Sequence, residues 1–442
     1  MPKTLLTKGN KKLLNAWAFY DWANSVYALV IASAVFPLYY GALFRAADIE
    51  KVAVFGTEIA RAPLISYVTS AAFIFIALVT PLLSGIADYL GNKKVFMKFF
   101  CYLGGLSCIG LYWFSLENIY VGLLFYFLGL VGYWVSFAIN NSYLPDIAYE
   151  RQQDQISAKG YSMGYIGSVI LLLFNLAMVM NPEAFGIPDR DDAPAEMLAM
   201  RYSFVSVGIW WILFSQYTFY YLPKGNKREG ARENIVFNGF RELRSVWGQL
   251  GENRVLKRYL LAFFVYSMAV QTVMLIAAFF GEEEIAWGSD SERTIGLIVS
   301  ILVIQLVAIV GATLTARASR VFGNISTLVG INMLWVGICI YAYYVVSPME
   351  FYLVAGIVGL VMGGIQALSR STYSKFIPQT RDTTSFFSFY DVAEKIGIVI
   401  GTFLYGMVAQ FTGSMRNATI FLGIFFLAGI FLLLRVHRKT KP

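Results

Sequence analysis

Residues 63–94 read PLISYVTSAAFIFIALVTPLLSGIADYLGNKK. The first 25 of these residues, 63–87, contain no charged side chain, and Asp88, Lys93 and Lys94 follow closely. About 20 consecutive apolar residues are enough for an α-helix to cross the hydrocarbon core of a bilayer. Because backbone groups inside lipid must hydrogen-bond within their own segment, this run predicts a membrane-spanning helix that ends near the charged residues.

The same pattern recurs along the whole chain. Of its 442 residues, 58% are hydrophobic and 14% are charged, against about 25% charged in a typical soluble domain. We therefore expect an all-α integral membrane protein with 12 transmembrane helices in two six-helix, pseudo-symmetric bundles. The predicted spans lie near residues 15–44, 63–87, 94–115, 119–145, 158–180 and 201–222 in the first half, and near residues 257–280, 293–316, 325–347, 350–375, 384–411 and 416–436 in the second.

The sequence offers little for enzyme chemistry. Its three cysteines, Cys101, Cys108 and Cys339, lie in apolar runs without a neighbouring histidine, and its single histidine is His437 in the C-terminal tail. This argues against a disulfide framework, a zinc site and a histidine-based catalytic triad. The chain also lacks the GxxxxGK[ST] phosphate loop. We expect no catalytic residues, no metal site and no cofactor, and therefore no enzyme.

Positive charges are distributed unevenly along the chain. If both termini face the cytoplasm, 27 of the 35 Lys and Arg residues lie in cytoplasmic tails and loops and seven lie in outer loops, while Lys395 lies within a span. Cytoplasmic loops of membrane proteins carry an excess of Lys and Arg. This uneven distribution predicts an orientation with both termini cytoplasmic. The net charge of +8 reflects that orientation and does not indicate binding to nucleic acid.

A basic segment with seven Lys and Arg residues, 223–256, separates the two sets of spans. We expect a six-helix domain at 1–222, a cytoplasmic linker at 223–256, and a second six-helix domain with a basic tail at 257–442. The pattern in the linker predicts an amphipathic helix on the inner membrane surface, but it does not distinguish a plain linker from a regulatory segment. Its apolar residues at helical spacing are Val236, Phe240, Leu243, Trp247 and Leu250, and Arg241, Glu242 and Arg244 take the other face.

The two halves contain a short internal repeat. The turn after the second span reads SGIADYLGNKK and the turn after the eighth reads RASRVFGN, so that Gly91-Asn92 and Gly323-Asn324 fall at equivalent places. Repeats of this kind are typical of secondary transporters, whose halves rock around a central site.

The segment SGIADYLGNKK resembles the signature between helices 2 and 3 of the major facilitator superfamily, with Asp88, Gly91, Lys93 and Lys94 in register. Three further stretches are WAFYDWANSVY (17–27), GGIQALSRSTYSKFIP (363–378) and FFSFYDVAEKIGIVIG (386–401). Together they resemble the vacuole-effluxer-like branch of that superfamily, which is related to autophagy-associated amino acid effluxers of fungi and has many bacterial members. The resemblance spans the chain and implies twelve helices, alternating access and secondary transport.

Asp21 lies about two turns into the first span, close to Asn24. Ionisable residues inside a span are costly, and they usually face a cavity or a partner. Since removal from water disfavours the charged form of a carboxyl group, such a residue could bind and release a proton as access alternates. Asp21 and Asn24 are thus candidates for coupling or substrate contact. The alternative is a hydrogen-bonded Asp that fixes helix packing.

Helix 11 carries Asp391, Glu394 and Lys395 on one face, because residues three and four positions apart are neighbours on a helix. The spacing pairs Asp391 with Lys395 and leaves Glu394 as the better candidate for a titrating residue. The alternative is a salt-bridge cluster that joins Asp391 and Lys395 with Arg370 of helix 10 as an inner gate.

The resemblance implies a further gate contact. In the superfamily the signature acid, here Asp88, approaches the N-terminus of helix 11, here Thr383, Thr384 and Ser385. Unpaired N–H groups and the helix dipole attract a carboxylate at such a terminus. The contact would hold the inner side shut, with Gly91 in the same turn. Lys93 and Lys94 are interpreted as residues that only set the orientation of the spans.

Neutral polar side chains inside spans are additional candidates for the substrate or coupling site, because such groups seldom face lipid. Closely spaced glycines in helices 5, 10 and 11 are expected to permit close helix packing. The polar candidates are Asn140 and Asn141 in helix 4, Asn175 in helix 5, Gln271 in helix 7 and Gln366 in helix 10.

These features favour a secondary active transporter of a small polar organic solute, such as an amino acid, coupled to protons or driven as efflux by the solute gradient. A lipid translocase, with membrane lipid as substrate, is one alternative. A non-transporting scaffold or receptor is another, which would leave the cost of carboxylates in two spans unexplained. The expected location is the bacterial inner membrane, or the vacuolar membrane for a fungal protein.

Overall fold

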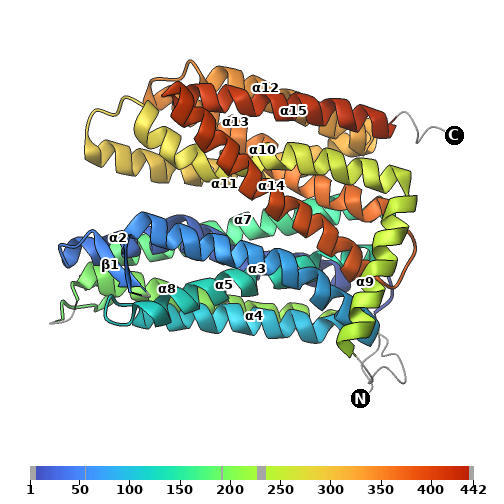
Figure 1. Cartoon of the computed structure of the whole chain (residues 1–442), viewed down its shortest axis with the longest axis horizontal. Helices are drawn as coiled ribbons and strands as arrows, with labels where there is room; N and C mark the ends of the chain where they lie inside the picture. The colour runs from blue at the N-terminus through green and yellow to red at the C-terminus, as the bar shows by residue number, and fades with distance from the viewer. Residues whose placement is uncertain (1–5, 55, 191–192, 226–234, 438–442) are drawn as a thin grey trace.

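The computed structural model describes residues 6–54, 56–190, 193–225 and 235–437. Figure 1 shows two layers of long helices, with the helices up to α8 (Ala195–Tyr221) in one layer and those from α10 (Arg254–Glu284) in the other. Helix α9 (Ile235–Glu252) and the two chain termini lie at one end of these layers, and the hairpin of β1 (Lys51–Val54) and β2 (Thr57–Ala60) lies at the other. We refer to these as the α9 end and the hairpin end.

The remaining elements form spans that alternate in direction between the two ends. In the first half they are α1 (Lys11–Val26), the π-helix η1 (Tyr27–Val35), α2 (Phe36–Ala46), α3 (Arg61–Leu90), α4 (Lys93–Gly110), the 3-10 helix η2 (Leu111–Trp113), α5 (Ile119–Asn141), α6 (Leu144–Ile147), α7 (Glu150–Met180) and the 3-10 helix η3 (Pro182–Phe185). In the second half they are α11 (Asp290–Phe322), α12 (Asn324–Ala342), α13 (Pro348–Phe376), α14 (Thr383–Thr412) and α15 (Met415–His437).

Within the described residues, 12 helices are long and apolar enough to cross a membrane, six before α9 and six after it. This confirms the predicted number and type of spans. The first of them, Lys11–Ala46, combines α1, η1 and α2. Each half has its own hydrophobic core, with Trp211 buried in the first and Trp335 in the second. The molecule is therefore two helical bundles placed side by side.

Two helices begin earlier than the apolar runs indicate. Helix α7 begins at Glu150 instead of near residue 158, and α8 begins at Ala195 instead of near residue 201. The start of α7 is a capping box, in which Tyr149 and Gln152 bond to each other's backbone. The first turns of α7 are polar because they face the other bundle rather than lipid: Ser157 Oγ donates to the backbone oxygen of Ala367 at 2.7 Å.

Close packing between helices depends on glycine. This was expected for the tenth predicted span, which is α13. A Cβ on Gly359 of α13 would lie 2.5 Å from the backbone oxygen of Ile304, and one on Gly363 would lie 2.2 Å from that of Ala308. Both distances are too short for any side chain, so α13 and α11 approach each other backbone to backbone.

The predicted apolar residues of α9 lie in two environments. Leu250 is buried and Leu243 is half-buried, whereas Phe240 and Trp247 are exposed. Helix α9 packs against α3 at Gly239, and Leu250 belongs to the hydrophobic core of the second half. The apolar side chains of α9 are therefore divided between a side that contacts protein and an exposed side. The side chain of Val236 lies outside the described residues.

Candidate functional site

Arg370 of α13 joins the two bundles through all five of its N–H groups. Nη1 and Nη2 each donate to Oδ2 of Asp21 in α1 at 3.1 Å, and Nη1 also donates to Oδ1 of Asn141 in α5 at 2.9 Å. Nε donates to Ser157 Oγ, and Nη2 donates to the Ser157 backbone oxygen, both at 2.9 Å. Every partner belongs to the first half of the chain. All donors of the guanidinium are thus used, and they connect α13 to α1, α5 and α7. We refer to these contacts as the Arg370 fork.

Arg370 and Asp21 are fully enclosed. Their side chains are 0% and 2% exposed, and the guanidinium carbon lies 4.7 Å from the ring centroid of Trp17 and 4.2 Å from that of Tyr161. A Cβ on Gly160 would lie 2.3 Å from Asp21 Oδ2, so this glycine makes room for the pair. A buried ion pair must be fully hydrogen-bonded to offset the loss of water. Arg370 meets that condition, whereas Oδ1 of Asp21 has no partner among the described residues.

A second charged cluster lies on α14. Lys395 Nζ lies 2.9 Å from Asp391 Oδ1 and 3.0 Å from Glu394 Oε2. Gln271 of α10 donates to Glu394 Oε1 at 2.8 Å. Lys395 also lies 3.4 Å from the ring centroid of Trp134, which belongs to α5 of the first half. The α14 cluster therefore faces the interface between the two bundles.

The two clusters differ in charge. Arg370 and Asp21 neutralise each other, whereas Asp391, Glu394 and Lys395 carry a formal excess of one negative charge when all are ionised. Lys395 is almost completely buried, and the Glu394 side chain is 14% exposed. An uncompensated charge in the membrane interior is costly. The α14 cluster is therefore the better place to bind a proton or a positively charged group, with Glu394 as its more accessible member.

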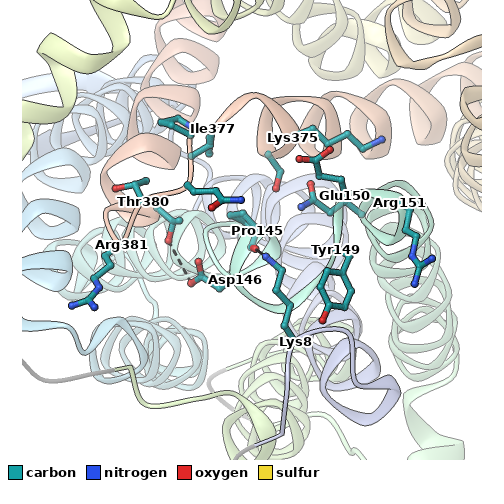
Figure 2. A pocket seen from close by; sticks show the side chains of 15 residues that line it. Lys8, Pro145, Asp146, Tyr149, Glu150, Arg151, Lys375, Ile377, Thr380 and Arg381 are labelled. Atoms are coloured by element: carbon teal, nitrogen blue, oxygen red, sulfur yellow. Dashed lines mark hydrogen bonds between the residues drawn. The ribbon is translucent and has the colours of Figure 1, made fainter.

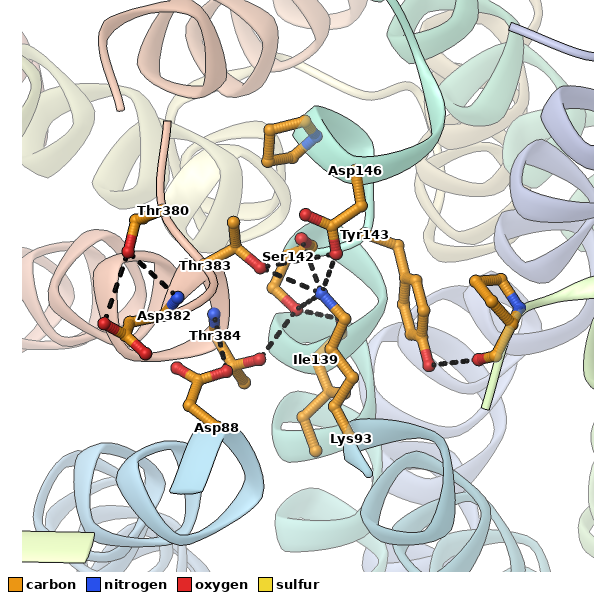
Figure 3. A network of polar contacts seen from close by, with 12 residues as sticks. Asp88, Lys93, Ile139, Ser142, Tyr143, Asp146, Thr380, Asp382, Thr383 and Thr384 are labelled. Carbon is orange, nitrogen blue, oxygen red and sulfur yellow. Dashed lines mark hydrogen bonds and ion pairs between the residues drawn. The ribbon is translucent and has the colours of Figure 1, made fainter. Parts of the chain in front are cut away.

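Asp88 connects α3 to the start of α14 (Figure 3). Its Oδ1 accepts a hydrogen bond from the backbone N of Thr384 at 3.3 Å. Its Oδ2 accepts from the backbone N and the Oγ of Ser385 at 2.7 and 2.8 Å. This is the carboxylate–helix-terminus contact that the resemblance implies. Gly91 ends α3 in the left-handed region with φ of 61°, a conformation that glycine adopts without strain.

Lys93 extends the same contact network (Figure 3). Its Nζ donates to the backbone oxygen of Ser142 at 3.0 Å, to Oγ1 of Thr383 at 2.9 Å and to the carboxylate of Asp146. Lys93 is buried, and it links the α5–α6 turn to the first residue of α14. We refer to these contacts of Asp88 and Lys93 with the start of α14 as the α14 gate.

Asp154 forms a second bridge at the α9 end. It lies 2.6 Å from Lys375 Nζ of α13, and it accepts hydrogen bonds from Asn324 Nδ2 at 3.0 Å and Ser319 Oγ at 3.1 Å. Asn324 belongs to the Gly-Asn pair that repeats Gly91-Asn92 in the second half of the chain. The two repeated turns thus occupy related places, since each lies where one bundle contacts the other.

A cavity of about 1090 Å³ opens between the α6–α7 turn and the α13–α14 loop (Figure 2). Its lining includes charged residues from both halves, such as Glu150 and Arg381, and the N-terminal segment at Lys8. Gln153 and Ser374 also line it, and each is 2% exposed with one side-chain oxygen that has no partner in the described part of the chain. The cavity therefore lies between the α9 end of the molecule and the contacts of Asp154 and the α14 gate.

Comparison with known proteins identifies the family. Residues 9–441 match the family model described as "Vacuole effluxer Atg22 like". The chain belongs to this family. It is 32% identical over 441 residues, covering 97% of this chain and 95% of the relative, to an uncharacterised major-facilitator-type transporter, YxiO, of Bacillus subtilis. It is 25% identical to autophagy-related protein 22 of Eremothecium gossypii, over 78% of this chain and 72% of that protein.

Solved structures place this Atg22-like chain in the major facilitator fold. FucP, the fucose:proton symporter of E. coli, aligns in its outward conformation with a TM-score of 0.69 at 15% identity, covering 96% of this chain and 98% of FucP. The human organic anion transporter MFSD10 aligns with a TM-score of 0.68 at 12% identity, covering 96% and 99%. The protein is a multi-pass membrane transporter of the major facilitator superfamily and not an enzyme.

Most of the predicted site residues of this transporter meet in two clusters. Asp21, Asn141 and Arg370 meet in one cluster, and Gln271, Asp391, Glu394 and Lys395 meet in the other. Arg370 does not join the acids of α14, because Asp21, Asn141 and Ser157 of the first half occupy all its donors. Gln366 of α13 accepts a hydrogen bond from Tyr165 Oη of α7 at 2.7 Å, which crosses the bundle interface.

Three predicted residues lie away from these clusters. Asn175 accepts a hydrogen bond from Ser206 Oγ at 3.0 Å, which joins α7 to α8 within the first half. Asn24 and Asn140 are completely buried, and their side-chain amides have no partner among the described residues. Trp17 Nε1 instead donates to the backbone oxygen of Asn140 at 2.7 Å.

Sequence reasoning missed several contact residues. Asp154, Ser157 and Tyr161 share one face of α7, at the spacing of successive helical turns. Trp134 of α5 contacts Lys395. The signal for α7 was present, since a polar stripe at three- and four-residue intervals continues from residue 154 into an apolar helix. Lys93 gave no such signal, because a lysine after a span also fits the charge bias of a loop.

The α14 gate gives a first testable prediction. Asp88→Asn removes a charge from the N-terminus of α14, a contact worth about 1 kcal/mol or roughly fivefold in an equilibrium constant. A cysteine at Ser374, in a background with the three native cysteines changed to alanine, should then react about fivefold faster with a water-soluble maleimide. Asp48→Asn, at the exposed hairpin end, is the matched control and should leave the rate unchanged. Equal rates for both variants would show that Asp88 does not hold this end shut.

Proposed function

We propose that this protein is a secondary active transporter of a small polar organic solute, with amino acids as the leading candidates, coupled to protons or driven as efflux by the solute gradient. The observation that carries the proposal is the α14 cluster, which combines a net negative charge with a position in the bundle interface. A transporter needs such a group, because a proton or a cationic part of the solute can neutralise it. The amino acid class is what the resemblance to autophagy-associated effluxers of fungi implies.

In the proposed cycle, the halves 1–222 and 257–442 rock about the two charged clusters while residues 223–256 connect them. The described conformation is the one closed at the α9 end, where the Arg370 fork, the α14 gate and the Asp154 bridge all join the halves. Opening that end breaks these contacts together. Asp21, Asn24, Asn140, Asn141, Asn175, Gln271, Gln366 and Glu394 are proposed for solute binding or coupling, and Asp88, Gly91, Arg370, Asp391 and Lys395 for gating.

The α9 end is proposed to face the cytoplasm. Both termini then lie on the cytoplasmic side of a bacterial inner membrane, or on the cytosolic side of a vacuolar membrane in a fungus. The support is the excess of Lys and Arg at this end. Single cysteines at Gly225 and Arg190 test the orientation in intact cells. A membrane-impermeant maleimide should label position 190 directly and position 225 only after permeabilisation. The reverse pattern would overturn the orientation.

The transport activity is tested with purified protein in liposomes. Accumulation or exchange of radiolabelled amino acids, absent from protein-free liposomes, is the expected result. A parallel assay with fluorescent phospholipid measures movement between leaflets and addresses the lipid translocase. Lipid movement without solute movement would replace the proposed substrate class.

A further inference from the structure

Helix α9 lies across the ends of the spans instead of parallel to them (Figure 1). One of its faces is fixed to α3. A Cβ on Gly85 of α3 would lie 2.3 Å from the backbone oxygen of Gly239 and 3.5 Å from the Cβ of Leu243. Asn238 Nδ2 donates to Tyr89 Oη at 3.0 Å. Since α3 ends at Leu90, these contacts hold α9 at the level where the spans leave the membrane.

A second face of α9 is aromatic and exposed. Phe237, Phe240 and Trp247 are 68%, 56% and 63% exposed. At 3.6 residues per turn they fall within a sector of about 80°. Aromatic side chains at the ends of membrane spans are enriched at the level of the lipid headgroups. The position of α9 and the grouping of these rings therefore put this face in the membrane interface.

Two arginines lie on either side of Phe237, Arg241 at the border of the aromatic face and Arg244 within it. Arg241 and Arg244 are exposed, and neither makes a hydrogen bond or an ion pair with another residue in the described part of the chain. In the same projection they lie next to Phe237, while Ser245, Gln249 and Glu252 take the polar side. Guanidinium groups pair with phosphate oxygens in a bidentate manner, and long basic side chains at an interface reach the headgroups. The free charge of these arginines complements an anionic lipid surface.

We propose that α9 binds the headgroups of anionic phospholipids through Arg241 and Arg244, with Phe237, Phe240 and Trp247 inserted in the interface, and that this binding stabilises the closed α14 gate. Helix α9 contacts both partners of the gate. Asn238 holds Tyr89, the residue after Asp88, and the Trp247 ring lies 5.3 Å from that of Phe389 in α14. A lipid that immobilises α9 thus holds the ends of α3 and α14 together.

The binding step is tested by tryptophan quenching in vesicles. Phosphatidylcholine vesicles contain either dibrominated phosphatidylglycerol or dibrominated phosphatidylcholine, and the Trp247 signal is the difference between wild type and Trp247→Phe. Each arginine at a membrane surface contributes about fivefold to the affinity for anionic lipid. We expect stronger quenching of Trp247 by the anionic lipid, and loss of this preference in Arg241→Gln/Arg244→Gln.

The matched control is Arg317→Gln/Arg320→Gln, which removes two exposed arginines near the end of α11 and should keep the preference. Equal quenching by both lipids, or a preference that survives the α9 double variant, would overturn the binding site.

The gate step is tested with the Ser374→Cys reporter, which requires no transported solute. Its labelling should be several-fold slower in phosphatidylglycerol than in phosphatidylcholine vesicles, and this difference should vanish in the α9 double variant. Equal labelling in both lipids would overturn the link to the gate. Protection by inorganic phosphate in phosphatidylcholine vesicles would instead assign the arginines to a soluble anion. Because no solute is used, these outcomes are independent of the proposed transport activity.

Discussion

Arg370→Met is expected to destabilise the transporter by about 3–5 kcal/mol, the usual cost of leaving one partner of a buried ion pair alone. The substitution removes five hydrogen bonds and leaves the carboxylate of Asp21 without a counter-charge in a 2% exposed position. Asp21→Asn should also destabilise, since the guanidinium then keeps its charge without an anion. The measurement is the thermal unfolding midpoint of purified protein at matched detergent concentration.

The double variant Asp21→Asn/Arg370→Met separates charge from packing. It removes both charges, so it should unfold at a higher temperature than Arg370→Met alone, although below wild type because Asn141 and Ser157 still lose their donors. Arg416→Met is the matched control, since Arg416 pairs with Glu284 at 2.7 Å nearer the surface and such pairs are worth about 1 kcal/mol or less. A double variant no more stable than Arg370→Met would show that the ion pair does not hold the halves through its charges.

Glu394→Gln is expected to abolish solute accumulation driven by a pH gradient while solute exchange continues. Glutamine keeps the size of the side chain and can still accept the hydrogen bond from Gln271, but it cannot exchange a proton. A gradient of one pH unit supplies about 1.4 kcal/mol per proton, or roughly tenfold accumulation. The variant should lose this tenfold factor in liposome uptake, compared with and without an imposed gradient.

Glu282→Gln is the control for this experiment, because Glu282 is an exposed carboxylate near the hairpin end of α10. It should accumulate solute like wild type. Asp21→Asn differs from both, since its first effect is on stability, and it must be compared at matched amounts of folded protein. Wild-type accumulation by Glu394→Gln would show that the coupled proton lies elsewhere.

The sequence was sufficient for the spans because the membrane imposes a length and a composition on each helix. It was also sufficient for local pairs. Asp391 and Lys395 meet because residues four apart share a helical face, as the 2.9 Å contact shows. The Asp88 contact was reached through the resemblance, which transferred a known helix 2–3 signature onto this chain.

Partners between the two halves were not predictable from local patterns. Arg370 stands 21 residues before Asp391 and in the same half, so the sequence grouped it with the acids of α14. Its actual partners come from three helices of the other half, selected by the way α13 faces α1 and α7 across the interface. Lys93 is a similar case, because its burial depends on the α5–α6 turn and the start of α14 rather than on its neighbours in sequence.

The Arg370 fork also has a consequence for biosynthesis. Asp21 and Arg370 are 349 positions apart, and chains are made at about 5–20 residues per second, so Asp21 is synthesised on the order of 20 to 70 seconds before its partner exists. During that interval the first six spans must enter the membrane with an unpaired carboxyl group. Joining the two bundles then waits for the arrival of α13, whose arginine pairs with a residue made among the first.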